Sequence, residues 1–289
     1  MLTEVAHAKL NLSLRVTGRR PDGFHELVSL VASVDLADRL SFVPGGPWKL
    51  ITDDPALPCD ETNLVIKAAH ALQRRCPALS SGAFALEKKI PSGAGLGGGS
   101  SDAAATLRLL NRTLLQPLTI EALCEVAAEI GSDCPYFISG GVALMRGRGE
   151  KVERVSASVT QALAGRRVVI VKPPFGVPTP EAYRLLANTH SYTESIKAEA
   201  RLQAWLQQPA GNPAEMGNDL QSPVFGKYMA LPVALAEVTQ ATGVVFRMTG
   251  SGSACFAFCP EAKDISPITA ALRRCWGPGL WVSDSRILG

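Results

Sequence analysis

The chain has 289 residues, of which 46% are hydrophobic and 19% are charged, and its formal net charge is +3 at pH 7. This length is enough for one large or two ordinary domains, and the composition is that of a globular protein. The small charge and the lack of a dense Lys/Arg run argue against a nucleic-acid partner. No apolar run approaches the roughly 20 residues that span a bilayer, so we expect no membrane contact.

The cysteines indicate a reducing compartment. Their number, seven, is odd and no C-x-x-C spacing occurs, which argues against a disulfide framework and a zinc ribbon. Cys255 and Cys259 lie in an apolar run and are expected to be buried thiols. The N-terminus does not show a basic segment followed by an apolar one, so no signal peptide is predicted. We expect a cytoplasmic protein.

The first segment predicts a half-buried strand, because apolar residues alternate with polar ones from Ala8 to Val16. Lys9 and Asn11 share the polar face, which is solvent or a ligand cleft, and Arg15 is assigned to solvent. The following turn contains Phe24 and His25. These two could stack on a ring ligand or cover the core, and the local sequence favours the core.

Further elements are expected before the next motif. A second strand covers 27–36, a strand pair covers 38–51 through the turn 44–47, a helix capped by Thr62 or Asn63 covers 64–75, and a strand covers 84–90. Lys88 and Lys89 at the end of that strand would bring positive charge near any phosphate bound by the segment that follows.

The segment 91–102 holds five glycines between Gly93 and Gly99, followed by two serines and an aspartate. Without Cβ atoms its backbone N–H groups can wrap an anion. The helix predicted over 101–110 would add its free N–H groups and the positive end of its dipole. The segment therefore predicts a phosphate-binding loop. Its G-x-G-x-x-G spacing also fits a dinucleotide turn or a protein-kinase loop, a Walker lysine is missing, and a linker is the structural alternative.

A second motif follows the helix predicted over 119–130, for which Thr119 is the expected cap. Here Asp133 lies between a helix end and a Pro-aromatic run. An acid in an apolar neighbourhood is costly unless it is paired or used. The local sequence leaves open whether Asp133 is functional or caps the next turn. A short strand, 142–145, lies between the glycine turns 140–141 and 147–149.

The second half predicts a smaller α+β layer. We place the domain boundary near residue 160, in the weakly patterned segment before a proline cluster, which gives domains 1–160 and 161–289. The loop 249–253 is either a hairpin turn or a second anion contact. The expected elements are strands over 166–171, 244–248, 254–258 and 280–283, and helices from Thr179, over 193–207, over 224–241 with a break at Pro232, and over 267–275.

Four stretches together resemble the GHMP small-molecule kinases: Lys9 with Asn11, and segments 91–102, 131–137 and 249–253. The form Gly-Leu-Gly-Gly-Gly-Ser-Ser-Asp-Ala-Ala at 95–104 is more particular. It is similar, together with segments 8–12, 20–26, 177–180 and 217–220, to the branch of this family that phosphorylates a cytidine-diphosphate-linked methylerythritol. The resemblance covers nearly the whole chain.

The resemblance implies a two-domain α+β fold, with a ribosomal-S5-domain-2-like α/β domain followed by a ferredoxin-like domain. It implies transfer of a phosphoryl group from ATP to the 2-hydroxyl of the methylerythritol, in the non-mevalonate route to isoprenoids. Asp133 would be the general base and Lys9 would keep it ionised. The residues implied to hold the ATP phosphates are Pro91, Ser92, Gly93, Ala94, Gly95, Leu96, Gly97, Gly98, Gly99, Ser100 and Ser101.

The resemblance also implies how the acceptor is held. Cytidine would lie near Phe24 and His25, with Thr179 and Tyr183 contributing, and Asn11 would bind the polar part of the acceptor. Mg²⁺ would bridge the ATP phosphates, with no protein ligand assigned. Phe24 departs from the family, which often has tyrosine here.

Three alternatives are weighed. A family member acting on homoserine or mevalonate-like substrates is disfavoured by the turn 22–25. A nicotinamide-dependent dehydrogenase is disfavoured because the glycine loop follows several strands and no acid ends a strand about 20 residues on. A non-catalytic nucleotide-binding module would have no need of Asp133.

Overall fold

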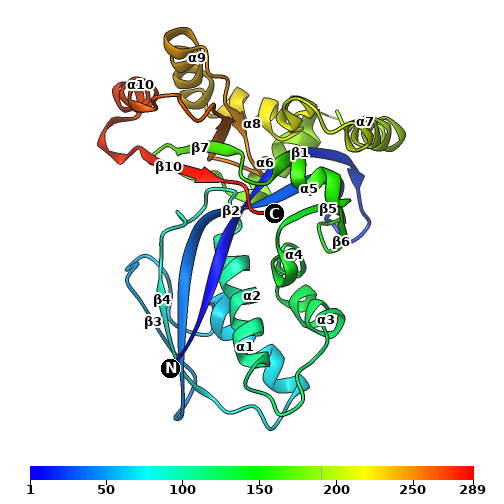
Figure 1. Ribbon diagram of the computed structural model, residues 1–289, viewed down its shortest axis with the longest axis vertical. Helices are drawn as coiled ribbons and strands as arrows, with labels where there is room; N and C mark the ends of the chain where they lie inside the picture. Colours follow the sequence, from blue (N-terminus) through cyan, green and yellow to red (C-terminus); the bar gives the residue numbers. More distant parts are fainter. Residues whose placement is uncertain (190) are drawn as a thin grey trace.

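The computed structural model describes residues 1–189 and 191–289. Two sheets, each with its own helices, lie one above the other, and the C-terminus lies between them (Figure 1). In the described chain the first sheet has six strands in the order β3-β4-β2-β5-β6, with β1 paired to β2. These strands are β1 (Leu2–Arg19), β2 (His25–Pro44), β3 (Lys49–Thr52), β4 (Gly82–Glu87), β5 (Val142–Gly147) and β6 (Lys151–Arg154).

The long hairpin of β1 and β2 carries the site. The strand predicted over 8–16 is confirmed, and Leu10, Leu12 and Leu14 on its apolar face are buried. The expectation that the strand is half-buried is wrong, because Lys9, Asn11 and Ser13 on its polar face are buried too. This polar face is shielded from solvent, because other segments of the chain pack on it. The assignment of Arg15 to solvent is wrong: its guanidinium pairs with Asp219 at 2.5 Å, so it fastens the second half of the chain onto β1.

The strand pair predicted over 38–51 is also wrong. Residues 38–44 continue β2, and β4 lies between β2 and β3, with Phe42 opposite Phe84 and Leu50 also opposite Phe84. An aromatic cluster explains this order, because the Phe84 ring centroid lies 4.8 Å from that of Phe42 and 5.7 Å from that of Trp48. Burying three rings together outweighs the local turn at 44–47.

Helices α1 (Leu64–Arg75), α2 (Gly98–Asn111), α3 (Ile120–Ile130) and α4 (Cys134–Ser139) lie on one face of this sheet (Figure 1). The expected caps are present, since the Asn63 side chain accepts from the Val65 N–H and Thr119 accepts from the Ala122 N–H. Helix α2 begins three residues earlier than predicted. The last glycines of the phosphate-binding loop are therefore its first turn, and its alanines are buried.

The second sheet has the order β10-β7-β9-β8. Pro232 does not break a helix, because it lies in the first turn of α9, where its missing N–H is not needed. The break falls at 228–229. The elements of this half are α5 (Ala157–Leu163), β7 (Arg167–Lys172), α6 (Thr179–Thr189), α7 (Ser195–Gln207), the 3-10 helix η1 (Pro213–Met216), α8 (Gln221–Lys227), α9 (Ala230–Thr242), β8 (Arg247–Met248), β9 (Cys255–Phe258), α10 (Ser266–Trp276), the 3-10 helix η2 (Gly277–Gly279) and β10 (Trp281–Arg286).

The two-sheet α+β architecture agrees with the predicted fold class. The boundary near residue 160 stays a prediction; that residue lies in α5, between the last strand of the first sheet and the first strand of the second. The C-terminal tail returns to the first sheet, where the Leu288 N–H donates to the Ser33 carbonyl oxygen at 2.9 Å. Among the described residues, no helix is both long and apolar enough to cross a membrane.

Candidate active site

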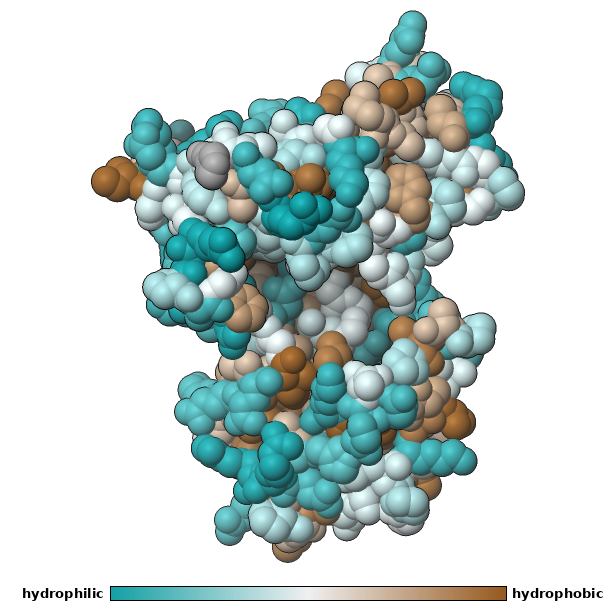
Figure 2. Space-filling model, turned by 180° about the vertical axis from the view of Figure 1, so that it is seen from behind, coloured by the Kyte–Doolittle hydropathy of each residue, from teal (hydrophilic) through white to brown (hydrophobic). Residues whose placement is uncertain are grey.

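A cavity of about 1060 Å³ lies between the two sheets, where the space-filling view shows the surface deeply hollowed (Figure 2). Every predicted site residue lines it except one. The exception is Ser101, whose hydroxyl donates to the His7 carbonyl oxygen at 2.7 Å. Ser101 therefore joins α2 to β1, and only residues 91–100 of the predicted phosphate-binding loop border the cavity.

The glycine loop is held between two other segments. The Lys9 N–H donates to the Leu96 carbonyl oxygen, and the Ala254 N–H donates to the Ala94 carbonyl oxygen. Gly95 has a φ of +77°, and a Cβ built on it would lie 2.6 Å from the Thr249 carbonyl oxygen. Gly95 thus needs to be glycine for two reasons, its left-handed backbone and this close approach. The linker alternative is excluded, because the loop is fixed on both sides.

The loop 249–253 does connect the hairpin of β8 and β9, and Gly250 and Ser251 within it also line the cavity. Its hydroxyls tie three parts of the chain together. The Thr249 hydroxyl accepts from the Asn11 N–H at 2.8 Å, and the Ser251 hydroxyl lies 2.9 Å from that of Thr179. The loop 249–253 therefore holds together the cavity-lining residues Asn11 and Thr179.

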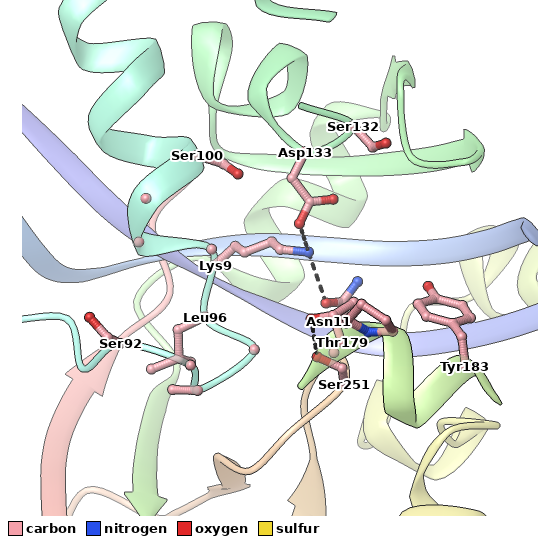
Figure 3. A pocket seen from close by; sticks show the side chains of 18 of the residues that line it. Lys9, Asn11, Ser92, Leu96, Ser100, Ser132, Asp133, Thr179, Tyr183 and Ser251 are labelled. Atoms are coloured by element: carbon pink, nitrogen blue, oxygen red, sulfur yellow. Dashed lines mark hydrogen bonds and ion pairs between the residues drawn. The ribbon is translucent and has the colours of Figure 1, made fainter. Parts of the chain in front are cut away.

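Lys9 and Asp133 meet at the centre of the cavity (Figure 3). The Lys9 ammonium lies 2.9 Å from Asp133 Oδ2 and donates to Asn11 Oδ1 at 3.0 Å. The Lys9 side chain is 6% exposed, whereas that of Asp133 is 33% exposed. Asp133 occupies the N-cap position of α4, yet its side chain makes no capping bond. The capping alternative is thus excluded: this carboxylate turns toward the lysine and the cavity.

Asn11 is itself held in place. Its side-chain N–H donates to the Ser29 hydroxyl at 2.8 Å, which donates in turn to the Ser13 carbonyl oxygen at 2.6 Å. This chain fixes the amide orientation, since the amide oxygen must then face Lys9. Asp133, Lys9 and Asn11 thus form a continuous chain of polar contacts in the cavity.

A second buried lysine lies beside the glycine loop. The Lys88 ammonium contacts Asp38 and lies 2.7 Å from Asp102 Oδ2. Burial alone would lower the pKa of Lys88, but Asp102 and Asp38 raise it. Asp38 also accepts from the N–H groups of Lys89 and Ile90, which fastens the entry of the loop. Lys88 does border the cavity beside the loop, as expected, but its pairing with Asp38 and Asp102 reduces the net positive charge that it adds there.

Aromatic side chains line the opposite end of the cavity. The rings of His25 and Tyr183 are stacked, with centroids 4.8 Å apart. Phe24 is 47% exposed, so the local expectation that it covers the core is wrong. Burial, helped by the nearby Arg19, lowers the pKa of His25, so its ring is neutral at pH 7 and one of its nitrogens can accept a hydrogen bond.

The structure adds cavity residues that the sequence did not reveal. Leu57, Pro58, Leu64 and Ile90 form an apolar end beyond the glycine loop, a setting suited to a flat purine ring. Arg148 lines the aromatic end. No local pattern marks these residues as cavity residues, because the segment 57–64, Ile90 and Arg148 meet only in the folded chain.

The residues present fit a nucleotide triphosphate. Three loop glycines at 93, 95 and 97 have positive φ, and the loop continues directly into the N-terminus of α2, so backbone N–H groups and the helix dipole face one place. Within residues 1–189 and 191–289, no group of three or more His, Cys, Asp or Glu side chains could hold a metal ion. A Mg²⁺ would rest mainly on phosphate oxygens, with the cavity-lining Ser100 hydroxyl as an available protein oxygen.

This fold and site define a GHMP-type small-molecule kinase. The model of the GHMP kinases N-terminal domain matches residues 63–141, and that of the GHMP kinases C-terminal domain matches residues 197–277. Solved structures of a homoserine kinase from Cytophaga hutchinsonii and of a mevalonate kinase share the fold, with TM-scores of 0.69 and 0.68 at 18% and 12% identity.

Within this class, the chain belongs to the family of 4-diphosphocytidyl-2-C-methyl-D-erythritol kinases. A protein of that name from Synechococcus sp. (strain CC9902) is 40% identical, over 99% of each chain. Another, from Pelotomaculum thermopropionicum, is 36% identical over 95% of this chain and 94% of its own. A crystal structure of a 4-(cytidine 5'-diphospho)-2C-methyl-D-erythritol kinase superposes with a TM-score of 0.75 at 31% identity, covering 99% of each chain. The family resemblance and the fold class predicted from the sequence are confirmed.

Proposed function

We propose that this protein transfers the γ-phosphoryl group of ATP to the 2-hydroxyl of 4-diphosphocytidyl-2-C-methyl-D-erythritol, in non-mevalonate isoprenoid precursor synthesis. The observation that carries the proposal is the position of the Lys9–Asp133 pair, between a glycine loop on one side and an aromatic pocket on the other. Phosphoryl transfer requires a protein mainly to position the two substrates and to neutralise the phosphate charge, and this cavity offers groups for both.

The geometry supports the following catalytic roles. Asp133 accepts the proton of the acceptor hydroxyl as that oxygen attacks the γ-phosphorus. Lys9 balances the negative charge of the transferring phosphoryl group while it fixes the carboxylate. Asn11, held by Ser29, binds a hydroxyl of the methylerythritol. Lys9 and Asn11 are oriented before substrate binds, because each has two partners in the protein: Lys9 contacts Asp133 and Asn11, and Asn11 contacts Lys9 and Ser29.

The ATP half is built mostly from backbone. Residues 91–100 surround the phosphates, with N–H groups offered by the residues after Pro91, and the adenine lies in the apolar end formed by Leu57, Pro58, Leu64 and Ile90. Mg²⁺ bound to the phosphates would neutralise part of their charge.

The acceptor half is built from side chains. Phe24 and Tyr183 offer ring faces for the cytosine, and the neutral His25 offers a hydrogen bond to its polar edge. The Thr179 hydroxyl, positioned by Ser251, adds a contact from the second domain. We infer that a small molecule is the partner. The seven cysteines are free thiols, which supports a reducing, cytoplasmic location.

A coupled assay of ADP release tests the proposal. The purified chain is given ATP and Mg²⁺ with the cytidyl substrate, homoserine or mevalonate in parallel. We expect turnover with the cytidyl substrate alone. Turnover with homoserine or mevalonate and none with the cytidyl substrate would overturn the substrate assignment while leaving the kinase class intact.

A further inference from the structure

Arg148 lies in the tight turn between β5 and β6, and the sheet carries that turn to the aromatic end of the cavity. Leu27 of β2 is paired with Gly147 of β5, which places the turn beside the one that holds Phe24. Gly147 and Gly149 have φ values of +69° and +118°, so the glycines on both sides shape the turn. Glu150 closes it by accepting from the Arg148 N–H at 2.7 Å. The arginine side chain is thus presented from a fixed backbone.

The guanidinium of Arg148 is a cation with no carboxylate partner in the described part of the chain. It lies 5.0 Å from the centroid of the Phe24 ring and donates to the Ala128 carbonyl oxygen at 3.3 Å. The nearby acids form their ion pairs with other cations: Asp22 pairs with Arg20, although it also lies within the electrostatic reach of Arg148, and Asp133 pairs with Lys9. A half-buried arginine that lines a cavity without an acid is available for an anionic ligand.

The order of groups in the proposed substrate places its diphosphate at this arginine. The cytosine belongs at the Phe24 end of the cavity and the reacting hydroxyl at Asp133, so the diphosphate that joins them lies in between. Arg148 contacts Phe24 at one end, and its neighbour Gly149 approaches the other, since a Cβ built there would lie 3.3 Å from Asp133 Oδ1. The turn 147–149 therefore runs along this gap, with the positive side chain of Arg148 at its Phe24 end.

We propose that Arg148 binds the diphosphate of the acceptor and makes the site prefer a cytidine diphosphate over cytidine. This rests on the proposed function, because it takes the substrate class from there. The guanidinium fork can donate two hydrogen bonds to phosphate oxygens, and the Phe24 ring supports its flat face.

Calorimetric binding of cytidine and of CDP to the full chain tests the role, with wild type beside Arg148→Met and Arg148→Lys. Losing a charged hydrogen-bond partner should weaken CDP binding about ten- to hundredfold in Arg148→Met. Cytidine binding should change by less than about threefold, since it lacks the phosphates and loses only support of the Phe24 ring. Arg148→Lys should recover part of the CDP affinity, because it keeps the charge but not the fork.

Arg166→Met is a matched control. The Arg166 guanidinium also lies over an aromatic ring, 4.1 Å from the Phe258 centroid, and also donates to one carbonyl oxygen, that of Gly211. It does not line the cavity, so both affinities should match wild type. Equal weakening of cytidine and CDP in Arg148→Met would overturn the inference, because the arginine would then act only through Phe24. Wild-type protein that binds neither ligand would overturn the proposed substrate class, and this inference with it.

Discussion

Two buried lysines line the same cavity, and they differ in what surrounds their carboxylate partners. Lys9 and Lys88 have side chains that are 6% and 7% exposed. Lys9 meets one carboxylate, on Asp133, which keeps 33% of its surface open. Lys88 meets two, on Asp38 and Asp102, which are 0% and 4% exposed. The carboxylate of the first pair is accessible to a substrate, whereas both carboxylates of the second group are buried against Lys88.

The comparison teaches that exposure to the cavity, and not residue type, distinguishes a lysine–carboxylate pair that can act on a substrate from one that stabilises the fold. An open carboxylate beside a lysine can exchange a proton with a ligand. The buried Lys88 instead joins β2 to helix α2, because it pairs with Asp38 and Asp102. Asp38 also accepts from the backbone N–H groups of residues 89 and 90, which fixes the start of the glycine loop. Four substitutions probe this contrast, from the largest expected effect to the smallest.

Asp133→Asn should abolish most of the turnover while the protein still binds ATP. The amide cannot accept the proton of the acceptor hydroxyl, so we expect kcat to fall about 10²- to 10⁴-fold. Steady-state ADP release measures the loss, and calorimetry with an ATP analogue measures nucleotide binding. Unchanged turnover would contradict the role of Asp133 as general base.

Lys88→Met should destabilise the fold and Lys9→Met should not. Removing Lys88 leaves the buried Asp38 carboxylate without a counter-charge and Asp102 without its ion-pair partner, which costs about 3–5 kcal/mol of unfolding free energy. Removing Lys9 leaves a carboxylate that water can reach, so the cost should be about 1 kcal/mol or less, although turnover should be lost. Urea unfolding of the two variants measures the difference. Equal destabilisation would mean that the two lysines do not differ as the structure indicates.

Asp102→Asn should flatten the pH dependence of stability. Burial raises the pKa of Asp102 to about 7, and the charge of Asp38 adds to this although Lys88 opposes it. The folded protein therefore holds a proton that the unfolded chain releases near pH 4, so this group makes the unfolding free energy fall as pH rises from about 4 to 7. In Asp102→Asn that decrease should be smaller, as chemical unfolding at several pH values would reveal. A variant with the wild-type slope would show that another group titrates.

Local sequence determined the site elements that depend on neighbours along the chain. The alternation of β1 placed Lys9 and Asn11 on one face, and the glycine run followed by serines predicted both the loop and the helix that begins there. The caps Asn63 and Thr119 were predictable because a capping side chain bonds within its own turn.

Tertiary structure decided what depends on distant partners. The sequence left open whether Asp133 is a cap or a functional acid, and only the missing capping bond and the 2.9 Å approach to Lys9 exclude the cap. Asp38 lies 50 residues from Lys88, so no window of the sequence could show that they pair. The assignment of Arg15 to solvent failed for the same reason, as its partner Asp219 is 204 residues away.

The sequence by itself thus determined the family, the loop and the residue types of the site. The fold alone decided which of two similar lysine–carboxylate groups keeps an exposed carboxylate and where Arg148 lies. The physical reason is that backbone conformation and periodicity are local properties, whereas burial and charge pairing are set by segments that meet only in three dimensions.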